Sequence, residues 1–246
     1  LVFFSAAEIQ HLVSIAYPDH IRPLLLRRTA EELALDPYHV GRVISTAAFS
    51  VHQRSCLFLG LSDGARTDVF RRSNEDSVNH EQILQNYAIK AERVPKLLEK
   101  LRRDLKKIDP SLKDIDRATF NTIVLMDDFS ASGTSYLRFE NNKLDGKLFE
   151  ISRDIKDPES AVAQLVNAKT RILLVLYIAT NQAVDHLRNL LTEHWGKQNI
   201  KFEILVVHPL LPRSRSGPAI RSSRYLITIT TKLHLRTSTP TKASTG

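Results

Sequence analysis

Two adjacent carboxylates close a short apolar run and are followed by a loop of small residues. The run is Ile123-Val124-Leu125-Met126, the acids are Asp127 and Asp128, and Phe129 leads into Ser130-Ala131-Ser132-Gly133-Thr134. The run predicts a buried strand, and open parallel sheets bind ligands at the carboxyl ends of their strands. Small residues let backbone N–H groups approach an anion, and a helix beginning after the loop would add its dipole. We therefore expect a ligand whose phosphate binds the loop and whose hydroxyls, or a bound metal, contact the acids. A phosphorylated sugar meets both requirements.

Other protein classes also end an apolar strand in acids. A nucleotide hydrolase of the Walker type needs a G-x-x-x-x-G-K-[ST] loop, which this sequence lacks. A phospho-acceptor pocket of the receiver type needs the acid pair on the first strand and a further Asp on a later one, and neither condition holds. The simplest alternative remains that Asp127 and Asp128 only end a strand and cap a helix.

A second candidate segment follows the first predicted strand and reads Leu59-Gly60-Leu61-Ser62-Asp63-Gly64-Ala65-Arg66. Gly60 and Gly64 allow tight turns, while Ser62 and Arg66 supply hydrogen-bond donors. An ordinary strand-to-loop turn explains the same residues equally well. The polar stretch 66–79 has no apolar periodicity and is predicted to be a mobile loop, in which Arg66, Arg71 and Arg72 are either solvated or part of a lid over the site.

The two segments together resemble the phosphoribosyl pyrophosphate (PRPP) motif of type I phosphoribosyltransferases. The pair of motifs is most similar to the phosphoribosyltransferase-like branch of bacterial conflict systems, PRTase-CE. The motifs read Gly-Leu-Ser-Asp-Gly-Ala-Arg and Asp-Asp-Phe-Ser-Ala-Ser-Gly-Thr. The resemblance covers residues 5–212. It departs from the family at Ser132, where a first glycine is usual, and at Phe129.

The resemblance implies a role for each matching residue. Asp127 and Asp128 would hold the ribose hydroxyls, and Arg66 would join them as a catalytic residue. The phosphates would be bound by two sets: Ser130, Ala131, Ser132, Gly133 and Thr134 for the 5′-phosphate, and Ser62, Asp63 and Gly64 for the pyrophosphate. Mg²⁺ would be bound through PRPP, with no metal site built by the protein itself.

The resemblance further implies an effector of antiphage or intergenomic conflict. It would transfer or hydrolyse a phosphoribosyl group with release of pyrophosphate. A second hypothesis keeps the fold without catalysis: the pocket senses PRPP or a nucleotide and controls a partner protein from the same operon. A third is a nucleic-acid-binding protein that acts through a basic tail.

Charge is concentrated at one end of the chain. The net charge of the 246 residues is +8, and the 35 residues from Pro212 onward hold seven basic residues and no acid. The rest is close to neutral, so nonspecific attraction to nucleic acid is expected of the tail alone. A single cysteine, Cys56, excludes an internal disulfide and favours a cytoplasmic location. No apolar run approaches the roughly 18–20 residues of a membrane helix, so no membrane partner is expected.

Short apolar runs alternate with helical patterns along the chain. Strands are predicted at 56–61, 123–126, 172–178 and 202–207, and helices at 5–16, from Thr29, from Asp36-Pro37, over 83–88 and 97–105, from Asp157 and over 183–195 up to Gly196. This predicts an α/β protein with a Rossmann-like parallel sheet covered on both faces, which the resemblance narrows to the type I phosphoribosyltransferase kind. The expected organisation is a helical N-terminal region (5–54), the α/β domain (55–211) and a disordered basic Ser/Thr-rich tail (212–246). An edge strand at 225–230 is the one element considered in that tail.

Overall fold

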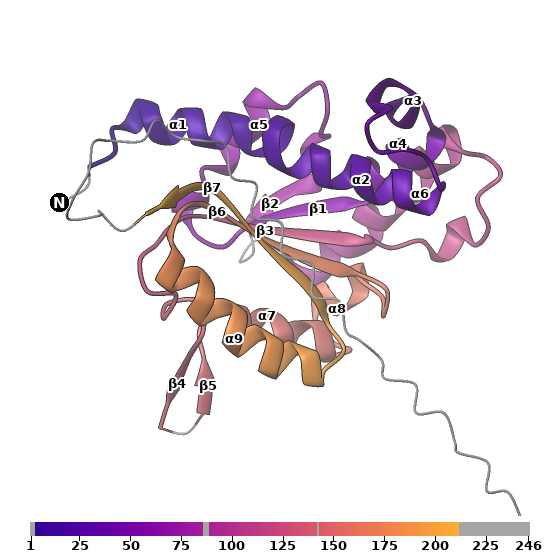
Figure 1. Ribbon diagram of the computed structural model, residues 1–246. Coiled ribbons are helices and arrows are strands. Elements are labelled where there is room, and N and C mark those ends of the chain that lie inside the picture. Colours follow the sequence, from indigo (N-terminus) through magenta and orange to yellow (C-terminus); the bar gives the residue numbers. More distant parts are fainter. Residues whose placement is uncertain (1–2, 86–88, 142, 212–246) are drawn as a thin grey trace, which may run out of the picture.

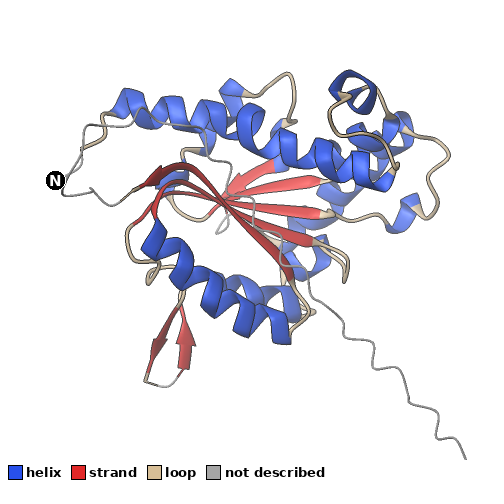
Figure 2. Ribbon diagram, viewed as in Figure 1, coloured by secondary structure: helices blue, strands red, loops and turns tan. Residues whose placement is uncertain are grey.

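A single parallel sheet forms the centre of the molecule (Figures 1 and 2). The computed structural model describes residues 3–85, 89–141 and 143–211. The five strands lie in the order β2-β1-β3-β6-β7, and all neighbouring pairs are parallel. Their bounds are β1 Cys56–Gly60, β2 Ile83–Gln85, β3 Thr122–Ser130, β6 Arg171–Thr180 and β7 Lys201–Leu210. The predicted α/β class with a Rossmann-like parallel sheet is confirmed.

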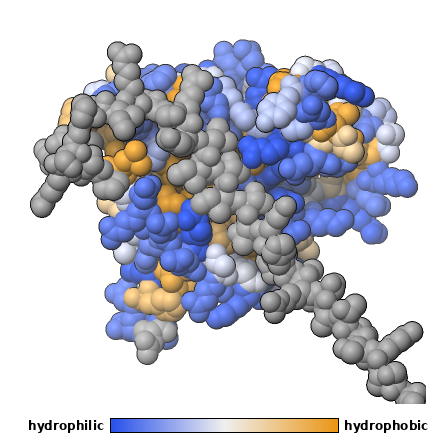
Figure 3. All heavy atoms as spheres, in the orientation of Figure 1, coloured by the Kyte–Doolittle hydropathy of each residue, from blue (hydrophilic) through white to orange (hydrophobic). Residues whose placement is uncertain are grey.

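Helices cover both faces of the sheet because successive strand residues point to opposite sides. In β3, Val124 and Met126 belong to one hydrophobic cluster, while Ile123 and Leu125 belong to the other. The first cluster includes residues of α1 (Ala6–Ile15), the π-helical turn Ala16–Ile21, α2 (Arg22–Glu32), α3 (Val40–Ile44), α4 (Ala47–Arg54) and α5 (Thr67–Ser73). The second includes residues of α6 (Val94–Ile108), α7 (Lys147–Lys156), α8 (Ala161–Leu165) and α9 (Asn181–Lys197). The face seen in Figure 3 is mostly hydrophilic with small apolar patches, since most large apolar side chains lie in these clusters.

The N-terminal helices pack directly on the sheet and share a hydrophobic cluster with it. The first helix begins as predicted: Ser5 caps α1, and its backbone N–H donates to the Glu8 carboxylate at 2.7 Å. The predicted helix start at Thr29 is wrong, because Thr29 lies inside α2 and its hydroxyl donates to the Leu25 carbonyl. The start at Asp36 is also wrong, because its carboxylate accepts the Tyr38 N–H in a local turn.

Four later elements also differ from the prediction. Residues 67–73 form α5, whose Val69 and Phe70 are buried, so the segment 66–79 is only partly loop. Ile83–Gln85 is a strand beside β1, where a helix was predicted. Near Asp157, α7 ends and α8 begins only after its N-cap Ser160. Helix α9 passes Gly196 and ends at Lys197.

A small hairpin and several short turns complete the chain. The antiparallel strands β4 (Arg138–Glu140) and β5 (Lys143–Asp145) project from the body of the molecule (Figure 1). Within the described residues, 3₁₀ turns lie at Asp63–Ala65, His80–Gln82, Ala91–Arg93 and Ile115–Arg117. The predicted tail 212–246, with the strand considered at 225–230, lies outside the described residues.

Two further observations bear on the sequence analysis. In the part of the chain that the structure describes, no helix is long and apolar enough to cross a membrane. Cys56 is fully buried at the start of β1, and this burial raises the pKa of its thiol to about 12. A buried thiol of this kind packs as a small apolar side chain and is not a nucleophile at neutral pH.

Candidate functional site

The two candidate segments meet where the strand order reverses. The chain passes from β1 outward to β2 and then returns to β3 on the other side of β1, so the carboxyl ends of β1 and β3 form a topological switch point. Gly60 is paired with Met126, and the Leu61 N–H donates to the Met126 carbonyl at 2.9 Å. This register places the turn after β1 directly beside the acids after Met126. Ligands of open α/β sheets bind at such a point.

Asp127 is a buried carboxylate whose charge is compensated inside the protein. It is 1% exposed. Its Oδ1 accepts hydrogen bonds from the Ser62 hydroxyl and from the Asp128 N–H, and its Oδ2 accepts one from the Lys147 ammonium at 2.7 Å. Lys147 also lies over the ring of Tyr136, with Nζ 5.2 Å from the ring centroid. Burial, together with the charge of Asp127, raises the pKa of the Tyr136 hydroxyl. Asp127 thus ties the β1 turn, β3 and the start of α7 together.

Asp128 is partly exposed and faces the turn after β1. Its Oδ1 accepts the Phe129 N–H at 2.8 Å. A Cβ added to Gly64 would lie 2.5 Å from Cγ of Asp128 and 2.8 Å from Oδ1, so the absence of a side chain at Gly64 lets the carboxylate lie against this turn. Phe129, next in the strand, is 46% exposed. Of the two acids, Asp128 is therefore the one that a ligand can reach without rearrangement.

The predicted phosphate loop is internally hydrogen-bonded and rests on the start of α9. The Ser130 hydroxyl accepts the Gly133 N–H at 3.1 Å, and the hydroxyls of Ser132 and Thr134 lie 2.8 Å apart. Gly133 has a φ of +79°, and a Cβ there would lie 3.0 Å from the Ala183 carbonyl oxygen. Ser130 and Gly133 are buried, whereas the other three loop residues, Ala131, Ser132 and Thr134, are exposed.

The helix expected directly after this loop is not there. A turn over 134–136 leads into the hairpin, and the next helix of the described chain is α7, from Lys147. The helix beside the loop is α9, whose N-cap Thr180 donates its hydroxyl proton to the Ala131 carbonyl at 2.5 Å. The prediction placed a helix after the loop because it treated helix and loop as neighbours in sequence. Because β6 pairs in parallel with β3, the helix that follows β6, α9, begins beside the loop instead.

The turn after β1 brings three of the predicted residues close to the acids. Ser62 binds Asp127, Gly64 lies against Asp128, and Asp63 is exposed between them. Arg66 directly follows the turn in a left-handed conformation (φ 45°, ψ 50°) at the N-cap of α5. Such a conformation costs a non-glycine residue roughly 1–2 kcal/mol. Six residues further along, Arg72 of α5 is paired with Asp68.

Sequence reasoning missed two members of the site. Lys147 and Tyr136 lie 20 and nine residues beyond Asp127. No motif marks either one. The one available signal was general: a carboxylate at the end of a buried strand requires a cation or several donors.

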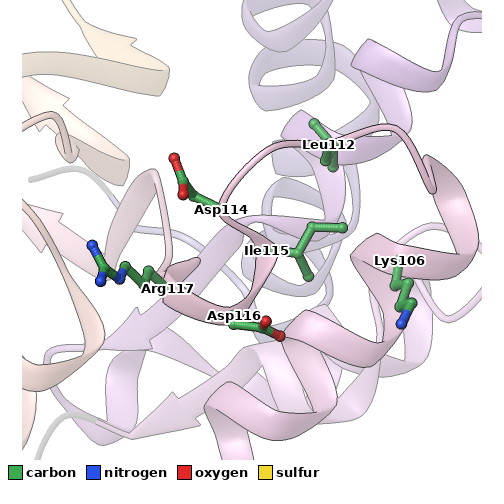
Figure 4. Close-up of a pocket in the computed structure, with 6 residues that line it drawn as sticks. All are labelled: Lys106, Leu112, Asp114, Ile115, Asp116 and Arg117. Atoms are coloured by element: carbon green, nitrogen blue, oxygen red, sulfur yellow. The ribbon is translucent and has the colours of Figure 1, made fainter.

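A separate hollow lies between the end of α6 and the segment that precedes β3 (Figure 4). It is lined by Lys106, Leu112, Asp114, Ile115, Asp116 and Arg117. These residues precede Thr122 at the start of β3, about 17 Å along the strand from Asp127 at the usual rise of about 3.3 Å per residue. The hollow contains none of the predicted site residues.

The chemistry of the site is that of an anion and hydroxyl binder. Exposed hydroxyls on the loop, the partly exposed Asp128 carboxylate and the Lys147 ammonium lie around one switch point, and Arg66 follows the turn after β1 in the chain. Within residues 3–85, 89–141 and 143–211, no three His, Cys, Asp or Glu side chains are grouped to hold a metal ion. No protein family, curated protein or solved structure gives a significant match to this chain.

Proposed function

We propose that this chain binds PRPP, or a closely related phosphorylated sugar, at the switch point between β1 and β3. The observation that carries the proposal is the meeting of the acid pair and small-residue loop of β3 with the Ser62–Gly64 turn of β1. The resemblance to type I phosphoribosyltransferases rests on these same two segments.

Each part of the site has a matching part of the proposed ligand. Asp128 accepts hydrogen bonds from ribose hydroxyls, and the exposed residues Ala131, Ser132 and Thr134 bind the 5′-phosphate. The Ser62–Gly64 turn and Arg66 bind the pyrophosphate. Mg²⁺ commonly uses one or two carboxylates together with substrate phosphates, and the partly exposed Asp128 suits that donor set. When bound, Mg²⁺ would neutralise charge on the pyrophosphate leaving group.

The proposed reaction is transfer or hydrolysis of the phosphoribosyl group with release of pyrophosphate. The sugar passes through an oxocarbenium-like state, so the protein contributes positioning and electrostatic stabilisation and needs no nucleophile. The PRTase-CE resemblance implies such an activity in an effector of bacterial conflict, and the single cysteine favours a cytoplasmic location.

A second candidate function is PRPP sensing without transfer, with a partner protein as the output. The observation that favours it is the state of Asp127, whose oxygens already bind Ser62 and Lys147 and which is almost fully buried. The Ser132 departure from the family loop points the same way. An assay for pyrophosphate release across a panel of acceptors separates the two candidates, because only the enzyme releases pyrophosphate.

The test of binding is calorimetric titration with PRPP and Mg²⁺. Asp128→Asn removes the accessible carboxylate. Asp116→Asn serves as its control, because Asp116 is an exposed acid in the segment that leads into the amino end of β3, away from the proposed site. We expect binding by the wild type and by Asp116→Asn, and a loss of about 10- to 100-fold in Asp128→Asn, which is the usual value of a charged hydrogen bond. Equal affinities of the two variants would refute the site, and a folded wild type that does not bind would refute the function.

A further inference from the structure

We propose that Lys147 is the specificity-determining cation of this site. When the ligand binds, the Lys147 ammonium leaves Asp127 and pairs with the ligand phosphate, while a sugar hydroxyl takes its place on Asp127. A sugar hydroxyl and a phosphate are therefore recognised together. This inference rests on the proposed function. It adds a residue that neither the acid pair nor the loop motif contains.

Asp127 requires a permanent partner. A buried carboxylate that loses its compensating cation carries a large desolvation penalty. Asp127 is 1% exposed, and Lys147 is the cation on its Oδ2. Lys147 therefore leaves Asp127 only when other donors replace it there. Ribose hydroxyls are such donors.

Lys147 is the more exposed half of the ion pair. Its side chain is about one-third exposed, while that of Asp127 is closed off. Its backbone is fixed by the end of the phosphate loop: the Leu148 N–H donates to the Tyr136 carbonyl at 2.9 Å, and Gly146 packs against that same carbonyl. The ammonium thus reaches from the loop side of the site to the acid pair, on a stem of four flexible carbons.

The exchange couples two recognition events. A phosphate alone would draw Lys147 away and leave Oδ2 of the buried Asp127 with neither a cation nor a replacement hydrogen-bond donor. A neutral sugar alone offers Lys147 no anion, so the ion pair stays closed and Oδ2 of Asp127 stays occupied. A phosphorylated sugar satisfies both groups at once, and selectivity for that combination follows.

The test compares Lys147→Met with Lys143→Met, an exposed lysine on β5 in the same segment. Both variants and the wild type are titrated with PRPP and Mg²⁺, with ribose 5-phosphate and with inorganic phosphate. Lys147→Met is expected to weaken binding of both sugar phosphates about 10- to 100-fold, the usual loss for a charge-assisted hydrogen bond. Lys143→Met is expected to match the wild type. A folded Lys147→Met that binds PRPP as well as Lys143→Met does, or more tightly, overturns the inference.

A second pair of variants does not depend on Lys147→Met folding. Asp127→Asn releases Lys147 from its acid, so we expect it to bind inorganic phosphate several-fold more tightly than the wild type. The double variant Asp127→Asn/Lys147→Met removes both charges, which proteins usually tolerate, and it should lose that gain. A purely structural lysine would produce no gain in Asp127→Asn, and that result would overturn the inference.

The outcomes separate this inference from the proposed function. Absence of PRPP and ribose 5-phosphate binding in the wild type refutes the proposed function. Binding that is lost in Asp128→Asn but unchanged in Lys147→Met refutes the role of Lys147 alone.

Discussion

Replacing Gly64 by alanine tests the apposition of the two segments with a single methyl group. The added Cβ would lie 2.5 Å from Cγ of Asp128 and 2.8 Å from its Oδ1. Gly64 does not have a positive φ, so alanine fits the backbone there. The methyl group therefore acts on the Asp128 carboxylate and not on the turn itself.

The expected effects on stability and binding differ in size. Carbon contacts are optimal at about 3.5–4.0 Å, so the carboxylate must move by roughly 1 Å. An off-rotamer side chain costs about 0.5–1.5 kcal/mol, while replacing glycine by alanine in a compatible conformation contributes about 0.4–1 kcal/mol of stability. These terms nearly cancel, and the free energy of unfolding should change by less than about 1 kcal/mol. Displacement of the ligand-facing carboxylate should weaken PRPP binding about 10- to 100-fold.

Calorimetric titration with PRPP and Mg²⁺, together with urea denaturation, measures both quantities on the same protein. Gly41→Ala is the matched control, because a Cβ there meets no atom within 4 Å. It should bind like the wild type. If Gly64→Ala also binds like the wild type, Asp128 does not contact the ligand from its present position. If it unfolds several kcal/mol more easily, the carboxylate is not free to move and the reasoning about the turn is wrong.

Three further predictions concern the backbone and pH. Arg66→Gly relieves a left-handed residue, so the free energy of unfolding should stay equal or rise by up to about 1 kcal/mol while PRPP affinity falls; a clear loss of stability in urea denaturation would contradict the strain. Gly133→Ala combines a φ of +79° with a Cβ 3.0 Å from the Ala183 carbonyl oxygen and should cost about 1–3 kcal/mol, and an unchanged melting temperature would count against the packing of the loop on α9. Burial lowers the pKa of His52 in the folded protein, so the unfolded chain binds more protons once the pH falls below the ordinary histidine value of about 6.5. Stability should therefore fall between about pH 7 and pH 5, and His52→Gln should flatten this dependence; equal slopes in the two proteins would exclude His52 as its source.

Several features of this protein follow from contiguous residues alone. Three of the longer strands, β1, β3 and β6, are buried on both faces, so their apolar runs stand out in the sequence without any knowledge of their neighbours. The position of Asp127 and Asp128 directly after the apolar run of β3 follows from the same run, although β3 itself continues past the acids to Ser130. The Ser5 cap of α1 is likewise decided within four residues.

Other features depend on contacts between distant residues, which no local pattern encodes. The strand β2 has only three residues and is stabilised by its pairing with β1, so its sequence shows no period. Helix α5 is defined by the burial of Val69 and Phe70 within an otherwise polar stretch. The unequal roles of the two acids are also tertiary, since Ser62 and Lys147 lie 65 and 20 residues from Asp127. The sequence determined that two carboxylates directly follow the apolar run of a buried strand. The parallel register of β1 with β3, and the return of the chain to α7, decided that Asp127 is buried in an ion pair while Asp128 stays partly exposed.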